Sequence, residues 1–174
     1  GGYEHRYRYL KNIMGLWMIQ SVKKELAPEM SYEEICREAA GSRIGSIVDC
    51  NDERFLAPES MTEEVQQACR ETKQQVPQGI GQVAAVIYQS LARCYAGTID
   101  DLQKQTGCVY EQIHVVGGGA NAEYLNELTA LETHKTVVAG PVEATAAGNV
   151  VIQLLAAGKW KNLTEARTCI AESF

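Results

Sequence analysis

One βαβ pattern constrains the fold of this chain more than any other feature of its sequence. Two short apolar runs, IHVVGG at 113–118 and TVVAG at 136–140, lie on either side of a segment whose leucines recur at helical spacing. Strand, helix and strand at this spacing are typical of parallel neighbouring strands joined by a right-handed crossover. The pattern predicts two parallel strands, with the connecting helix over residues 121–132.

The first of these strands runs directly into three glycines, Gly117, Gly118 and Gly119, with Asn121 at the expected start of the helix. Glycine lets a bound group approach the main chain, and the first N–H groups of a helix have no internal partners. Such a turn suits a phosphate or the edge of a nucleotide. On the glycines alone, a tight turn that binds nothing is an equal alternative, because they form neither G-x-G-x-x-G nor the lysine-bearing phosphate loop.

Helical spacing of apolar residues predicts several further helices. The first runs from Tyr7 to about Leu26 and is expected to be buried on several sides. A capping-box pair, Ser31 and Glu34, opens the second helix. A third helix is expected over about 62–73, and a long fourth helix after Gly79, ending at Gly107. Another should run from Pro141 to Gly158 and bury a stripe of Ala147, Val150, Val151, Leu154 and Leu155. A last helix should begin at Asn162 or Thr164.

The predicted sheet is small for the number of predicted helices. Typical sheets have several more strands than two, and a parallel sheet requires cover on both faces and pairing at its edges. The sequence therefore indicates part of a larger α/β fold.

Composition narrows the class of protein. A chain of 174 residues with 45% hydrophobic content is long enough for one domain. The net charge of -6 argues against a general nucleic-acid surface, which needs a basic face. Six cysteines without a C-x-x-C pair favour free thiols in a reducing cytosol. No apolar run approaches the length of a membrane span, so we expect a soluble cytoplasmic protein.

Two amides interrupt the apolar character of the first predicted helix, Asn12 and Gln20. A buried amide without a partner costs on the order of 1–3 kcal/mol, so each would need backbone, water or ligand as a neighbour. Eight residues of helix would separate them by about 12 Å along the axis and by roughly 80° of rotation. This spacing is compatible with two parts of one extended ligand complex.

Three stretches together resemble the FGGY family of carbohydrate kinases, which includes glycerol kinase and xylulokinase. They are RYRYLKNIMGLWMIQ at 6–20, IHVVGGGANAEYLNELTA at 113–130 and VVAGPVEATAAGN at 137–149, and DCNDERFLAPESM at 49–61 is also similar. The resemblance spans essentially the whole chain. KNIMGLW and AGPVEAT resemble the branch of the family that phosphorylates L-rhamnulose.

The resemblance implies a two-lobed kinase of the ribonuclease H-like, actin-like ATPase fold. Residues 1–174 would form a single domain, most of the C-terminal lobe, with the first strands of that lobe missing. Carried over by position, Asn12 would contact the sugar, Gln20 would lie near the nucleotide and Gly118 at the adenosine. Gly117 and Gly119 would shape the nucleotide-binding turn.

The resemblance also implies that the catalytic residues and any metal ligands lie outside this chain. The complete enzyme would bind ATP and Mg²⁺ in the cleft beside its N-terminal lobe and convert L-rhamnulose to its 1-phosphate, whereas this chain by itself would be inactive. Two alternatives stay open on the sequence. One is the C-terminal lobe of a kinase for another ketose or polyol, and the other is a non-catalytic α/β interaction module.

Overall fold

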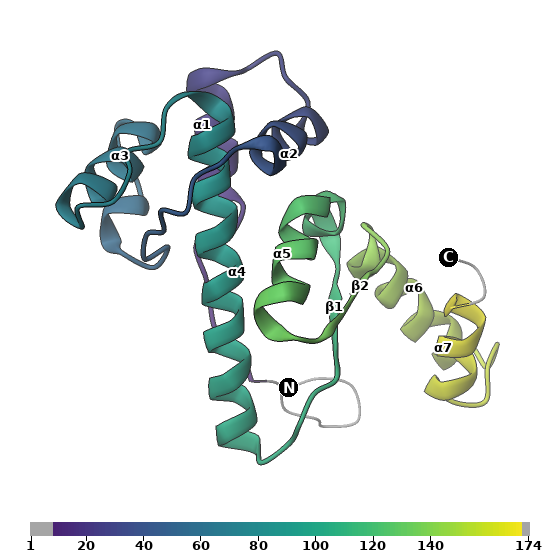
Figure 1. Cartoon of the computed structure of the whole chain (residues 1–174). Coiled ribbons are helices and arrows are strands. Elements are labelled where there is room, and N and C mark those ends of the chain that lie inside the picture. The colour runs from purple at the N-terminus through teal and green to yellow at the C-terminus, as the bar shows by residue number, and fades with distance from the viewer. Residues whose placement is uncertain (1–8, 172–174) are drawn as a thin grey trace. The chain divides into compact units, whose positions relative to one another are not determined.

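The computed structural model describes residues 9–171, which form helices and one small sheet (Figure 1). The helices are α1 (Trp17–Leu26), α2 (Tyr32–Gly41), α3 (Met61–Glu71), α4 (Gly79–Thr106), α5 (Glu123–Thr133), α6 (Ala144–Ala156) and α7 (Leu163–Ala171), with short 3-10 turns η2 (Glu53–Phe55) and η3 (Gly117–Asn121). The strands are β1 (Gln112–Val115) and β2 (Thr136–Ala139). The chain divides into two compact units, the first containing residues 1–113 and 122–137, and the second containing 114–121 and 138–174.

The first unit is organised around α4. Six consecutive residues of this helix, 83–88, are at most 1% exposed, so α4 is covered on all sides over nearly two turns. The covering elements are α1, α2, α3 and α5, each of which contacts α4 (Figure 1). Val83, Ile87 and Leu91 are fully buried on this helix, and Gly107, with φ of +67°, ends it as predicted.

Side chains cap the starts of the shorter helices. The predicted capping box of α2 is present, since Ser31 Oγ accepts from Glu34 N and Glu34 Oε2 accepts from Ser31 N. At the start of α3, Ser60 Oγ accepts from Glu63 N at 3.2 Å. Two further donors there, Met61 N and Thr62 N, reach the carboxylate of Glu25 on α1 at 2.7 and 2.9 Å. Glu25 thus caps a helix that lies about 35 residues further along the chain.

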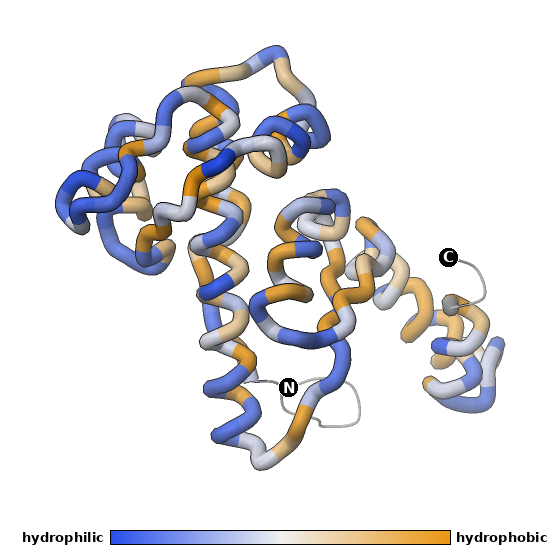
Figure 2. Tube along the Cα trace, in the orientation of Figure 1, coloured by the Kyte–Doolittle hydropathy of each residue, from blue (hydrophilic) through white to orange (hydrophobic). Residues whose placement is uncertain are grey.

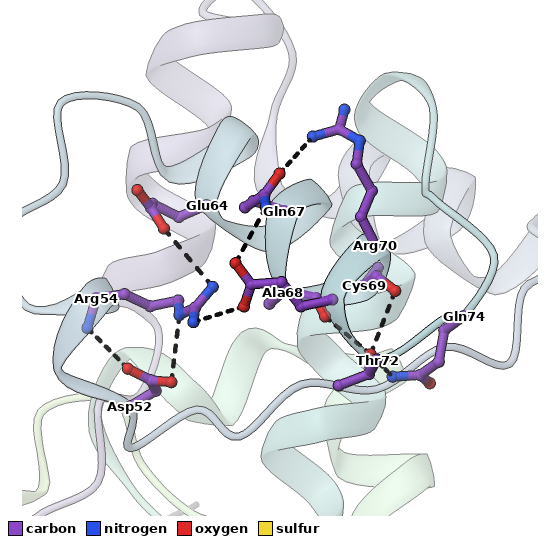
Figure 3. A network of polar contacts seen from close by, with 10 residues as sticks. Asp52, Arg54, Glu64, Gln67, Ala68, Cys69, Arg70, Thr72 and Gln74 are labelled. Atoms are coloured by element: carbon purple, nitrogen blue, oxygen red, sulfur yellow. Dashed lines mark hydrogen bonds and ion pairs between the residues drawn. The ribbon is translucent and has the colours of Figure 1, made fainter.

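An arginine joins η2 to α3 (Figure 3). Arg54 Nη2 donates to Glu71 Oε2 at 2.8 Å, Arg54 Nε donates to Asp52 Oδ2 at 3.2 Å, and Nη1 lies 4.0 Å from Glu64 Oε2. Phe55, in the same turn, is fully buried. Residues 49–60 are otherwise irregular, and these contacts attach them to α3.

The two strands are parallel, as predicted. Thr136 N donates to the carbonyl of Glu111, and Gly140 N donates to the carbonyl of Val115. In both bonds, the donor residue follows the acceptor residue by the same number of positions in the sequence. This constant offset is the register of a parallel pair. The crossover helix α5 lies between the strands in sequence, and β1 and β2 form a sheet of their own within the described residues.

The first helix begins later than predicted. Residues 9–14 have no regular structure and α1 starts only at Trp17, while residues 7 and 8 of the predicted helix lie outside the described residues. The reason is Gly15, whose φ of +65° is left-handed and cannot be part of a right-handed helix. α1 buries Met18, Ile19 and Val22, but Trp17 is 42% exposed, so burial is confined to one face.

The buried stripe predicted for α6 is also largely wrong. Val151 is buried, whereas Val150 is 54% and Leu154 38% exposed. Figure 2 shows the hydrophobic colour along α6. Within the second unit the helix that packs against α6 is α7, which covers one side of it. Apolar side chains on the other side therefore remain at the surface of the unit.

The six cysteines are all free thiols. Cys36, Cys50 and Cys69 are buried, and burial raises the pKa of Cys50 to about 12, with further contributions from Cys94 and Asp49. No helix among residues 9–171 has both the length and the apolar character needed to cross a membrane.

Candidate functional site

The glycine turn after β1 contains one glycine that the fold requires and one that it does not. Gly117 has φ of +76°, a conformation that favours glycine. Gly118 has no such φ, and a Cβ placed on it would meet no atom within 4 Å. Neither backbone strain nor packing among the described residues accounts for Gly118. The open space above its Cα is the feature that a closely approaching ligand would use.

Gly140, at the end of β2, is a useful contrast. A Cβ there would lie 3.0 Å from Val116 Cγ1 and 3.4 Å from the carbonyl oxygen of Val115. Close packing of the two strand ends therefore explains Gly140 without any ligand. The helix that follows the glycine turn, α5, has Ala122 at its N-cap and no side-chain cap. Its first N–H groups receive no side-chain acceptor of the kind that serves α2 and α3.

The two amides predicted as ligand contacts lie in the first unit, and both side chains are exposed. Gln20 is in the first turn of α1, with its N–H bonded to the Leu16 carbonyl at 2.9 Å. Asn12 lies before the helix, so the predicted separation of 12 Å along one helix axis does not apply. Because both side chains are exposed, water can satisfy their amides, and water is one of the three kinds of neighbour that the sequence left open.

Asn12 sits between two anchors in the first unit. On its C-terminal side, Ile13, Met14 and Leu16 pack against the core formed around α4. On its N-terminal side, Lys11 Nζ lies 3.5 Å from Asp101 Oδ2 near the C-terminal end of α4. The segment thus lies along α4 (Figure 1) while its amide points to solvent.

The carboxylates with shifted pKa values have structural partners. Burial alone would raise the pKa of Glu25, but hydrogen bonds from Ser60, Met61 and Thr62 outweigh it and lower the pKa. A hydrogen bond from the Arg54 N–H lowers the pKa of Asp52, and the Arg54 side chain lowers that of Glu71. Residues 9–171 contain no group of three or more histidine, cysteine or acidic side chains placed to hold a metal ion.

Sequence patterns did not indicate the structural roles of Glu25 and Arg54. Glu25 contacts Met61 and Arg54 contacts Glu71, and both partners lie too far along the chain for local spacing to indicate the pairs. Arg54 belongs to the stretch 49–61, which was recognised only by resemblance. The ion pairs of Arg54 with Asp52 and Glu71 attach η2, in that stretch, to α3.

Comparison with known proteins gives one family. The model of the C-terminal domain of the FGGY family of carbohydrate kinases matches residues 1–157. The expected fold, a helix-rich α/β lobe with a small parallel sheet, agrees with this match and with the observed elements.

Several bacterial proteins named rhamnulokinase align with nearly the whole chain. The protein of Bacillus subtilis is 42% identical over 174 residues, which are 99% of this chain and 36% of the relative. That of Oceanobacillus iheyensis is 44% identical over 174 residues, 100% of this chain and 37% of the relative. That of Enterococcus faecalis is 44% identical over 176 residues, 99% of this chain and 36% of the relative. The chain therefore spans little more than a third of these relatives, and it belongs to the FGGY family of carbohydrate kinases, whose C-terminal domain it matches.

Proposed function

We propose that this chain works as most of the C-terminal lobe of an ATP-dependent kinase that phosphorylates L-rhamnulose to L-rhamnulose 1-phosphate in the cytoplasm. The observation that carries the proposal is the identity of 42–44% over nearly the whole chain to proteins named rhamnulokinase. Residues 1–174 would serve as one functional domain although they divide into two compact units. A kinase of the same family acting on another ketose is the alternative, because most of such a relative lies beyond this chain.

The glycine turn would bind the nucleotide. Gly117 supplies the left-handed turn, and the bare Cα of Gly118 leaves space for a flat nucleoside against the main chain. Gly119 completes the run without adding a side chain there. For Gln20, exposed on the first turn of α1, the family resemblance implies a polar contact to the nucleotide in the longer enzyme.

Asn12 would hold the sugar. Its exposed amide can donate to and accept from neighbouring hydroxyl groups, which a sugar presents in pairs. These contacts bind and orient the acceptor, and orientation is a large part of catalysis in phosphoryl transfer. Changes at Asn12 would therefore affect the KM for the sugar, and changes in the glycine turn would affect the KM for ATP.

The remaining machinery would come from a partner lobe in the longer enzyme. Phosphoryl transfer requires a phosphate cradle, a base at the acceptor hydroxyl and Mg²⁺, which neutralises charge on the phosphates. By the family resemblance, the catalytic residues and the metal ligands lie outside this chain, which would then supply binding surface. The exposed apolar side chains of α6 and the unpaired edges of the two-stranded sheet are the surfaces that further protein would cover.

The test uses the chain alone and the chain fused behind the N-terminal portion of the Bacillus subtilis relative, in place of the 36% that it matches. ADP release is measured with ATP, Mg²⁺ and L-rhamnulose, and with other ketoses for comparison. We expect turnover by the fusion with a preference for L-rhamnulose, and none by the chain alone. Robust turnover by the chain alone would mean that the catalytic residues have been placed wrongly, and preference for another ketose would support the alternative.

Substitutions in the fusion separate the two binding roles. Losing one neutral hydrogen bond costs about 0.5–1.5 kcal/mol, so Asn12→Ala should impair use of the sugar, and Gln20→Ala use of ATP, each by roughly 2- to 15-fold. Gly118→Val should impair use of ATP without unfolding the lobe, because its side chain meets open space. Gly45→Val, which also meets no atom within 4 Å, is the matched control and should leave both KM values unchanged. An Asn12→Ala variant that weakens only ATP would refute the assignment.

A further inference from the structure

The segment that carries Asn12 has no hydrogen-bonded regular structure of its own. Residues 9–14 form neither helix nor strand, and Tyr9 and Leu10 are 65% and 83% exposed. Apolar burial begins only at Ile13, one residue beyond the amide. Burial of Ile13 therefore fixes Asn12 relative to α4 on its C-terminal side. On its N-terminal side, a contact of another kind is needed.

Lys11 provides that contact. Its Nζ lies 3.5 Å from Asp101 Oδ2, and both side chains are about half exposed, at 47% and 56%. Asp101 is on α4, the helix around which the first unit is built, so its backbone is held by the helix itself. The ion pair therefore connects the residue next to Asn12 to the C-terminal part of α4, whose N-terminal half lies at the centre of the unit.

We propose that Asp101, through Lys11, is a positioning residue that orders the 9–14 segment and so holds the Asn12 amide in place for the sugar. The proposal rests on the proposed function of Asn12, since it concerns how that residue is held. Asp101 touches Lys11 rather than the substrate, so its effect is on how often the amide is correctly placed.

The expected effect is small and depends on salt. Exposed ion pairs change an equilibrium by a factor of about 1.4 to 5, and screening by salt removes most of that. Loss of the pair should therefore raise the KM for the sugar by about 1.5- to 5-fold, with kcat and the KM for ATP nearly unchanged. In about 1 M salt, the wild-type and variant enzymes should converge.

The experiment uses the fusion described above and the substitution Asp101→Asn, with Asp100→Asn as the matched control. Asp100 is the adjacent exposed carboxylate of the same helix, one residue further round its circumference. Amide hydrogen exchange over residues 9–16 is measured on the same samples. We expect faster exchange and a higher sugar KM in Asp101→Asn, no change in Asp100→Asn, and recovery of both when Lys11→Asp is combined with Asp101→Lys.

The outcomes distinguish this inference from the proposed function. Unchanged exchange in Asp101→Asn would overturn the positioning role, as would a raised KM that salt does not abolish. If Asn12→Ala raises the sugar KM while Asp101→Asn does not, the positioning role falls and the function of Asn12 stands. If Asn12→Ala leaves the sugar KM unchanged, the proposed function of Asn12 falls, and the positioning role with it.

Discussion

Glu25→Gln should destabilise the chain, because Glu25 completes the N-terminus of a helix that belongs to another part of the sequence. Its carboxylate accepts from Ser60 Oγ at 3.1 Å, Met61 N at 2.7 Å and Thr62 N at 2.9 Å. Together with the Ser60 hydroxyl, it satisfies the N–H groups of the first three residues of α3, which have no acceptor within the helix.

The magnitude follows from what glutamine retains. With its oxygen in the place of Oε2, the glutamine amide can still accept from Ser60 Oγ and Thr62 N, whereas its NH₂ group would face the Met61 N–H and can accept nothing, so one bond is lost. One lost hydrogen bond costs about 0.5–1.5 kcal/mol, and the lost negative charge at a helix N-terminus about 0.3–1 kcal/mol. The sum is about 1–2.5 kcal/mol, which for a chain of this length lowers Tm by roughly 2–10 °C.

The same argument fixes the pH dependence. Hydrogen bonding lowers the pKa of Glu25 in the folded chain below its ordinary value of 4.5, against the opposing effect of burial. A group with a lowered folded pKa stabilises the fold above its unfolded pKa, and this contribution is lost as the pH falls through the folded pKa. The stability difference between wild type and Glu25→Gln should therefore be full near pH 6–7 and diminish below about pH 4.5.

Urea unfolding followed by circular dichroism, at several pH values between 3 and 7, measures this difference. Glu29→Gln, a change of the same type at an exposed carboxylate shortly after α1, is the control and should cost less than about 0.5 kcal/mol. A Glu25→Gln chain as stable as wild type at pH 7 would show that the cap contributes nothing to the free energy of unfolding. A difference that persists unchanged at pH 3 would show that the charge is not its source.

Three further outcomes follow from backbone conformation and thiol burial. Gly107→Ala should lower the free energy of unfolding by about 1 kcal/mol, because φ of +67° strains alanine. His134→Gly should raise it by about 0.5 kcal/mol, because glycine adopts the φ of 54° without strain. Chemical denaturation measures both changes, and effects of opposite sign would contradict the strain argument. Under native conditions, an aromatic disulfide reagent should label the exposed Cys108 and Cys169 first, and much slower labelling of these two than of the buried thiols would contradict the structure. After unfolding without a reductant, six thiols should titrate, and fewer would mean that a disulfide had formed.

Local patterns in the sequence predicted the regular elements well. Ser31 with Glu34 predicted the start of α2, Gly107 the end of α4, and the apolar runs around the glycines the parallel strand pair. Each of these signals acts within a few residues of the chain, where spacing alone determines which atoms can meet. The first strand, expected over 113–118, spans Gln112–Val115, because the chain turns into η3 at Gly117, and the second, expected over 136–140, spans Thr136–Ala139.

Predictions that required knowledge of the surroundings were less successful. The helix expected from Tyr7 failed because one left-handed glycine, Gly15, overrides several residues of helical spacing. The stripe on α6 was predicted as buried because Val150 and Leu154 have the right spacing, but spacing does not say whether a partner is present. The sugar-binding role of Asn12 was assigned by resemblance, and the resemblance could not indicate that this residue lies in an irregular segment whose Lys11 pairs with Asp101.

The enclosure of residues 83–88 of α4 determines the order in which this unit can acquire its structure. α1, α2 and α3 precede α4 in the chain, yet their core residues, such as Met18, Ile35 and Val65, pack in one cluster with Val83 and Ile87 of α4. During synthesis these earlier side chains therefore emerge without the surface that shields them, and stay open to association with other chains until α4 has been made. We expect chaperone binding to nascent chains to be strongest before residue 91 has emerged from the ribosome. During refolding, aggregation should begin from the same unshielded helices.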